Sequence, residues 1–162
     1  MKRRSLVVVS MLFVSAPALA HGEAEGKKRW SHAAAQIEEK PFGRAGDPKR
    51  VNRAVRVDMS DAMRFSPAEI RVKRGETVRF TVKNSGKQLH EMVLGSMTEL
   101  KEHAEMMKKF PGMEHDEPYM VHVRPGRSER LVWQFTKPGE FYYGCLIPGH
   151  FEAGMVGKII VE

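Results

Sequence analysis

The residues best suited to bind a metal lie close together near the end of the chain, within residues 141–155. The single cysteine, Cys145, is followed five residues later by His150 and after five more by Met155. Thiolate, imidazole and thioether are the soft or borderline ligands that copper accepts. Proline and glycine residues between them prevent a continuous helix, so all three side chains should project from a tight loop. This stretch therefore predicts a copper site.

The start of the chain has the three parts of a secretory signal peptide. Residues 2–4 are positively charged, residues 5–16 are almost entirely apolar, and residues 18–20 form an Ala-x-Ala cleavage signal. The apolar run is shorter than the roughly 20 residues that a membrane-spanning helix needs. We therefore predict that residues 1–20 are removed on export to the periplasm, which leaves no membrane anchor and a mature chain that begins at His21. A pair of arginines leaves both the Sec and the twin-arginine routes open.

The net charge and the single cysteine exclude some classes of function. The net charge is +7, and removing the three positive charges of the signal leaves +4, which is too low for the dense basic patch of a nucleic-acid binder. The basic residues are either simply solvated or steer the protein toward an acidic partner. An exported chain with one cysteine cannot form an internal disulfide, so that cysteine is an intermolecular partner, a reactive thiol, a metal ligand or an inert buried residue. The histidine and methionine that follow Cys145 favour the metal ligand.

The rest of the chain predicts a polar arm followed by one all-β domain. Residues 21–50 are rich in charge, glycine and proline, so we predict a polar N-terminal arm that builds no core. In residues 51–162, short runs of alternating apolar and polar residues are separated by turn residues, which predicts a β-sandwich of seven to eight strands. The predicted strands are residues 54–59, 70–73, 76–83, 89–94, 119–123, 131–135, 141–143 and 156–161.

One segment departs from the alternating pattern. Ser96 and Glu99 have the spacing of a capping box, which marks the start of a helix. Leu100, Ala104 and Met107 then recur at helical spacing until a Pro-Gly pair ends the run. We therefore predict one helix of about ten residues, inserted between two strands.

A copper site with two histidines, a cysteine and a weak axial methionine needs one histidine besides His150. His90 is the best candidate, because it follows a turn at residues 84–88 and leads into a predicted core strand. In a sandwich, strands that are far apart in sequence can meet at one end, so His90 can join the late loop. The remaining histidines lie in the arm, in the insert or on another strand: His21, His32, His103, His115 and His122.

A histidine after an Asn-Ser-Gly turn, followed in a late loop by Cys-x4-His-x4-Met, resembles the cupredoxin family of small blue-copper proteins over residues 51–162. The resemblance implies a Greek-key β-sandwich in which His90, Cys145 and His150 are equatorial copper ligands. It implies that Met155 is the axial ligand, with the alternative that this methionine only fills the core. Zinc is disfavoured, because structural zinc sites rarely use methionine.

The residue after the first predicted ligand departs from the family pattern. Many cupredoxins have asparagine or a small polar residue there, and it helps to tie the two ligand loops together, whereas this chain has Glu91. Groups around the ligands tune the redox potential and geometry of a metal site. The substitution leaves the potential and the colour of the site open.

The chain has eleven methionines, and several lie with histidines in or beside the predicted helical insert. His103, Met106 and Met107 are spaced to share one helix face. Such a group either packs in the core or forms a second, weaker copper-binding surface. If the mature chain begins at His21, its amine and imidazole can also chelate Cu(II).

Together these features favour a periplasmic protein that binds one copper and serves copper tolerance, with a soluble electron carrier as the alternative. The long arm and the Met/His-rich insert are similar to those of periplasmic cupredoxins associated with copper tolerance. A multicopper oxidase or nitrite reductase needs further histidines, usually as His-x-His pairs, and none occurs here. We therefore predict a monomer that is not an enzyme and does not bind nucleic acid. Its expected partners are copper ions and a redox or copper-trafficking protein.

Overall fold

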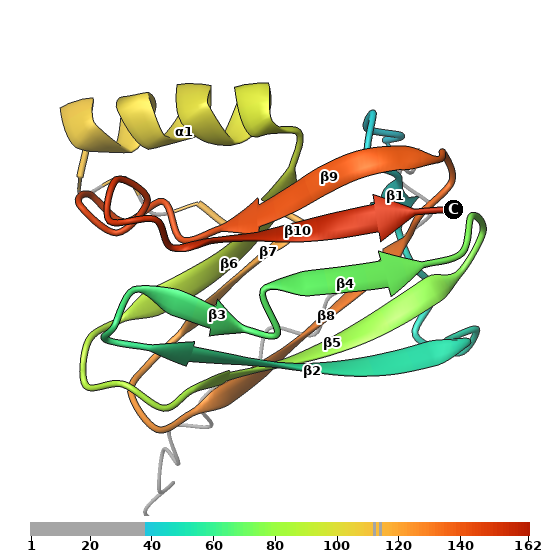
Figure 1. Ribbon diagram of the computed structural model, residues 1–162, viewed down its shortest axis with the longest axis horizontal. Coiled ribbons are helices and arrows are strands. Elements are labelled where there is room, and N and C mark those ends of the chain that lie inside the picture. Colours follow the sequence, from blue (N-terminus) through green and yellow to red (C-terminus); the bar gives the residue numbers. More distant parts are fainter. Residues whose placement is uncertain (1–37, 112, 114) are drawn as a thin grey trace, which may run out of the picture. The chain divides into compact units, whose positions relative to one another are not determined.

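The computed structural model describes residues 38–111, 113 and 115–162, and Figure 1 shows their arrangement. The predicted signal peptide, residues 1–20, and residues 21–37 of the predicted arm lie outside the described residues. Within the described part of the chain, no helix combines the length and the apolar character needed to cross a membrane.

The strands form two five-stranded sheets. The first sheet contains, in spatial order, β1 (Arg44–Ala45), β8 (Ser128–Gln134), β5 (Thr77–Asn84), β2 (Arg53–Ser60) and β3 (Arg64–Ser66). The second sheet contains β4 (Glu69–Val72), β10 (Val156–Val161), β9 (Gly139–Gly144), β6 (His90–Gly95) and β7 (Met120–Val123). Most neighbouring strands are antiparallel, but β2 runs parallel to β5 and β4 runs parallel to β10. The two sheets confirm the predicted all-β sandwich (Figure 1).

The core lies between the sheets and follows the alternation of apolar residues along each strand. Val78, Phe80 and Val82 of β5 are fully buried, while the residues between them are more exposed. From the other sheet, Ile159 and Val161 of β10 belong to the same buried cluster. A slip of one residue in either strand would turn these side chains to the solvent, so the alternation fixes the register.

All eight predicted strands are present, but the described residues contain ten strands. One of the two additional strands is the short β3, and the other is β1, which lies within the predicted arm and pairs with β8. The arm also contributes Phe42, which is buried, stacks on the ring of Trp133 at 5.3 Å and accepts a 2.8 Å hydrogen bond from its indole N–H. The chain therefore joins the sandwich before residue 51, because one buried aromatic residue anchors an otherwise polar segment.

The inserted helix, α1 (Met97–Lys109), begins with the predicted capping box between Ser96 and Glu99. It buries Leu100, Ala104 and Met107, and its main contacts are with β6 and β9 of the second sheet. The helix is thirteen residues long rather than about ten, because it continues to Lys109 with Phe110 as its C-cap. The insert is therefore packed on the sandwich through one face and leaves the opposite face to the solvent.

Candidate metal centre

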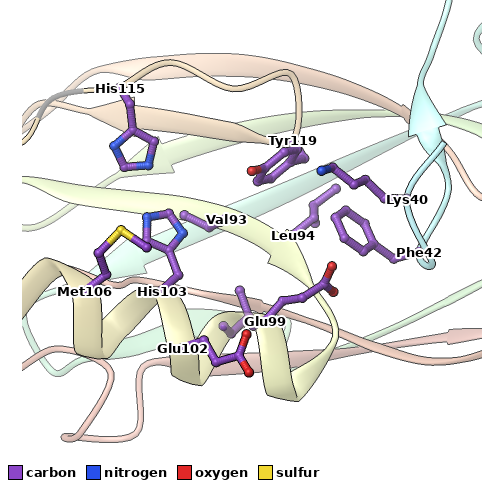
Figure 2. A pocket seen from close by; sticks show the side chains of 11 residues that line it. Lys40, Phe42, Val93, Leu94, Glu99, Glu102, His103, Met106, His115 and Tyr119 are labelled. Atoms are coloured by element: carbon purple, nitrogen blue, oxygen red, sulfur yellow. The ribbon is translucent and has the colours of Figure 1, made fainter. Parts of the chain in front are cut away.

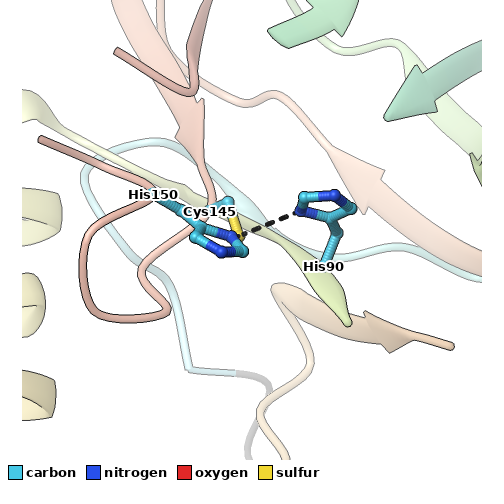
Figure 3. A group of neighbouring side chains, drawn as sticks. All are labelled: His90, Cys145 and His150. Atoms are coloured by element: carbon cyan, nitrogen blue, oxygen red, sulfur yellow. Dashed lines mark hydrogen bonds between the residues drawn. The ribbon is translucent and has the colours of Figure 1, made fainter. Parts of the chain in front are cut away.

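Three of the four predicted ligands meet at one end of the sandwich (Figure 3). His90 is the first residue of β6, Cys145 directly follows β9, and His150 lies in the loop between β9 and β10. One ligand atom from each residue lies within 4.8 Å of the other two, and all three side chains are buried. Residues 55 positions apart in the sequence, His90 and Cys145, are thus brought together by the pairing of β6 with β9.

The two histidines present the same kind of nitrogen to the cysteine sulfur. The Cys145 Sγ lies 3.3 Å from the Nδ1 of His150 and 4.0 Å from the Nδ1 of His90. The centroids of the two imidazole rings are 4.9 Å apart, and the ring planes are inclined at 50°. Two imidazole nitrogens and one cysteine sulfur around a common point are the donor set of a trigonal copper site, so the residues present fit that metal.

Met155, the predicted axial ligand, is completely buried at the end of the same loop. Its carbonyl accepts a 3.1 Å hydrogen bond from the backbone N–H of Cys145, and its own N–H donates to the carbonyl of His150 at 3.1 Å. These backbone bonds close the loop on itself and hold Met155 beside the other two loop residues. Its role as a ligand stays a prediction.

The loop that carries Cys145, His150 and Met155 is tight, as the proline and glycine residues predicted. The backbone N–H of His150 donates to the carbonyl of Ile147 at 2.9 Å. Gly149 and Gly154 have φ values of 91° and 87°, in the left-handed region where a side chain would be strained. The turns at these two glycines allow the chain to reverse twice within a short segment.

A carboxylate outside the predicted ligand set orients His90. The Nε2 of His90 lies 3.0 Å from Asp61 Oδ1, and Asp61 also accepts hydrogen bonds from the backbone N–H groups of Lys87 and Gln88. The hydrogen bond from Lys87 is the main cause that lowers the pKa of Asp61, and His90 lowers it further. A charged Asp61 favours the tautomer of His90 with its proton on Nε2, which leaves the Nδ1 lone pair free to face Cys145.

The turn that leads to His90 is built around the buried amide of Asn84. Its side-chain NH₂ donates to the carbonyls of Gln88 and Val123, both at 2.8 Å. Its side-chain oxygen accepts a hydrogen bond from the N–H of Gly86 at 2.9 Å. The Asn-Ser-Gly sequence therefore fixes both the shape of the turn and its distance from β7.

Glu91 connects the two ligand-bearing segments. Its carboxylate accepts a 2.8 Å hydrogen bond from the backbone N–H of Leu146 and pairs with the Nε2 of His122 at 2.9 Å. Its own backbone N–H points at Cys145 Sγ at 3.5 Å. The carboxylate is almost fully buried. A glutamate thus supplies the link that a small polar residue supplies in many cupredoxins, and it recruits His122 as a partner.

Burial sets the protonation of the metal-free site. It raises the pKa of the Cys145 thiol to about 12. Burial also lowers the pKa of His150, and the neighbouring His90 lowers it further. At neutral pH the site therefore contains a protonated thiol and a neutral His150 imidazole, so metal binding must release the thiol proton.

Sequence reasoning missed Asp61 and the partnership of His122 with Glu91. Asp61 has no fixed spacing to any ligand, and its only local signal is its position directly after a strand. His122 was correctly placed on a strand, but its pairing with Glu91 depends on the register of β7 against β6. Neither contact has a motif that could reveal it.

Comparison with solved structures finds proteins that share this fold. Among solved structures, a reduced auracyanin from Roseiflexus castenholzii superposes with a TM-score of 0.60 at 20% identity, covering 69% of this chain and 98% of that protein. An azurin from Methylomonas sp. strain J gives a TM-score of 0.54 at 19% identity, covering 69% of this chain and 99% of that protein. At this level of identity the likeness shows the fold.

Relatives with higher identity span nearly the whole chain. A protein of Rubrivivax gelatinosus named copper-resistant cuproprotein CopI is 49% identical, covering 99% of this chain and 96% of its own length. A Pseudomonas aeruginosa protein of the same name is 35% identical, covering 98% and 94%. The family model described as copper binding proteins, plastocyanin/azurin family, matches residues 51–162. The resemblance to cupredoxins is thus confirmed, and the chain belongs to the plastocyanin/azurin family of copper-binding proteins.

Proposed function

We propose that this protein holds one copper ion in the buried site and serves copper tolerance in the periplasm. The ligands are His90, Cys145 and His150, and Met155 is the weak axial ligand. The observation that carries the proposal is the convergence of one thiol and two imidazoles within 4.8 Å in a member of a copper-binding family. The names of the relatives from Rubrivivax gelatinosus and Pseudomonas aeruginosa support the tolerance role.

The surroundings of the site explain how it can serve both oxidation states of copper. When bound, copper supplies a one-electron redox couple. The protein's own residues hold the ligands in a fixed arrangement: Asp61 orients His90, and Glu91 fastens the segment after Cys145. Because all the predicted ligands are buried, water has little access and the arrangement changes little between states. Such a site keeps copper bound and also permits rapid electron transfer.

A soluble electron carrier would use the same site, so the choice between the two functions depends on the remainder of the chain. A carrier needs one copper and no surplus ligands, whereas this chain has histidines and methionines gathered on the helical insert. The predicted signal peptide supports the periplasm. The protein is a binding protein rather than an enzyme, acts as a monomer, and exchanges copper or electrons with a protein partner.

A deletion strain grown with and without added copper tests this function. We expect copper-sensitive growth together with normal respiration, restored by the wild-type gene but not by one encoding Cys145→Ser. The matched control is Met113→Leu, which alters an exposed methionine of the insert and should restore growth fully. Normal copper tolerance with impaired respiration would contradict the proposal and favour the electron carrier.

A further inference from the structure

A second pair of histidines lies outside the copper site described above. His103, on α1, and His115, in the segment that follows this helix, have ring centroids 4.8 Å apart with planes inclined at 40°. The corresponding values for His90 and His150 are 4.9 Å and 50°. The two pairs therefore hold their imidazoles at nearly the same separation and inclination.

The second pair lines a cavity of about 320 Å³ between α1, β6 and the segment before β7. Figure 2 shows the His103 ring, the sulfur of Met106 and the His115 ring gathered at one end of this cavity. Met106 follows His103 by three residues, so helical geometry places both side chains on one face. A thioether is thus added to two imidazoles, and all three are groups that copper accepts.

His115 has an unsatisfied nitrogen in this cavity. Its Nδ1 is buried and has no hydrogen-bond partner, and within residues 38–111, 113 and 115–162 it is the only such side-chain nitrogen or oxygen. A buried polar atom without a partner costs free energy, so most such atoms in proteins are paired. A bound metal ion would supply the missing partner.

The charges around the cavity also suit a cation. Apart from the two histidines, Lys40 is the one basic side chain in the lining, and its ammonium pairs with Glu38 at 2.7 Å. The lining also includes the carboxylate side chain of Glu102. Burial lowers the pKa of His103, and the nearby His115 lowers it further, so the His103 imidazole is neutral at neutral pH. A cation entering here meets one lysine, which is paired with Glu38, and no arginine.

We propose that His103, Met106 and His115 form a second copper site that binds Cu(I). The donors are two imidazoles and a thioether without a thiolate, a soft and uncharged set that suits Cu(I) better than Cu(II). Met106 is 48% exposed, so copper can enter and leave this site more easily than the buried one. The biological use of the site rests on the proposed copper-handling function, but its binding of Cu(I) does not require that function.

Titration of the mature full-length protein with Cu(I) under anaerobic conditions, followed by NMR, locates each equivalent. We expect the first equivalent to shift the imidazole resonances of His90 and His150. The second should shift the imidazoles of His103 and His115 and the methyl resonance of Met106. Resonances of the second group that stay unchanged while the first group shifts would overturn the second site alone. An absence of shifts at His90 and His150 would instead contradict the proposed function.

Variants measure the contribution of each donor. In competition with a chromophoric Cu(I) chelator, the double variant His103→Asn/His115→Asn should bind one equivalent fewer than the wild type and keep the first. Met106→Leu should weaken the second equivalent by about tenfold or more, the scale of losing a group that supports a metal site. Met113→Leu is the matched control, because Met113 is also exposed in the insert but does not line the cavity.

An unchanged number of equivalents in the double variant, or equal effects of Met106→Leu and Met113→Leu, would overturn the second site. If the double variant fails to fold, it also loses the first equivalent. The NMR titration of the wild type then tests by itself whether His103, Met106 and His115 bind Cu(I).

Discussion

The molecule contains two histidine pairs with similar geometry and different surroundings. The His90–His150 rings are 4.9 Å apart and the His103–His115 rings are 4.8 Å apart. The first pair is buried between strands and a short loop, and Asp61 fixes the orientation of one ring. The second pair joins a helix to the following loop and includes a buried nitrogen that lacks a partner. Two histidine pairs with nearly the same distance between their rings therefore lie in different surroundings.

The difference lies in how firmly each pair is held. At the first pair, the hydrogen bonds that Asp61 and Glu91 accept, together with the backbone bonds of the loop, leave the ligand side chains little freedom. Such rigidity suits a copper ion that stays bound and changes its oxidation state. At the second pair, Met106 is about half exposed and no described hydrogen bond of its side chain restrains it. This looser arrangement suits a copper ion that is exchanged.

The largest effect should come from removing the link that distinguishes the first site. Glu91→Ala should lower the free energy of unfolding of the metal-free protein by about 2–4 kcal/mol, because it removes the buried carboxylate that accepts from the Leu146 N–H and pairs with His122. Glu102→Ala removes an exposed carboxylate in the cavity beside the second pair. This variant should change the free energy of unfolding by less than about 0.5 kcal/mol. Urea unfolding of each variant and of the wild type measures both changes in free energy. Equal effects would show that Glu91 does not hold the site together.

A smaller effect is expected from the residue that orients His90. Asp61→Asn cannot accept all the hydrogen bonds that Asp61 accepts, so copper affinity at the first site should fall by about 10–100-fold while the second site is unchanged. Asp58→Asn is the matched control, since Asp58 accepts a hydrogen bond from Ser85. Competition titration of each site measures the affinities. An Asp61→Asn protein that binds copper like the wild type would show that Asp61 does not support the first site.

The two sites should also differ in how pH affects them. The pKa of Cys145 is raised to about 12, so its thiol is protonated throughout the neutral range and must lose a proton when copper binds. Lowering the pH from 8 to 7 therefore raises proton competition and should weaken the first site about tenfold. The second site has no thiol among its proposed donors, so its affinity should change less over this range. In Cys145→Ser, the copper affinity of the first site should no longer depend steeply on pH. A wild-type affinity that stays constant between pH 7 and 8 would contradict the release of a thiol proton.

Local patterns in the sequence were sufficient to predict eight of the ten described strands and the presence of the helix. Alternation predicted β5 because one face of a half-buried strand must be apolar, and Ser96 with Glu99 predicted the start of α1 because the capping box is a contact between near neighbours. The ligand loop could likewise be predicted from near neighbours, because Cys145, His150 and Met155 lie close together in the sequence. Phe42 was missed because a polar segment can be anchored by a single aromatic residue that packs on Trp133, far away in the sequence.

The surroundings of the two histidine pairs could not be predicted in the same way. The contacts of Asp61 with His90 and of Glu91 with His122 join different strands, and they depend on register and side-chain direction rather than on spacing. Helical spacing grouped His103 with Met106, but His115 reaches them only through the path of the segment after α1. The candidate donors could therefore be named from the sequence, whereas the groups that hold their side chains in place could not.

The visible absorption of the purified mature protein after addition of Cu(II) tests whether Cys145 binds copper. A cysteine thiolate bound to copper should give an intense charge-transfer band. The band should be absent in Cys145→Ser and should persist in Met106→Leu, which alters a proposed donor of the second site only. A colourless wild-type protein, or a band that survives Cys145→Ser, would contradict the assignment of Cys145 with His90 and His150 as the copper site.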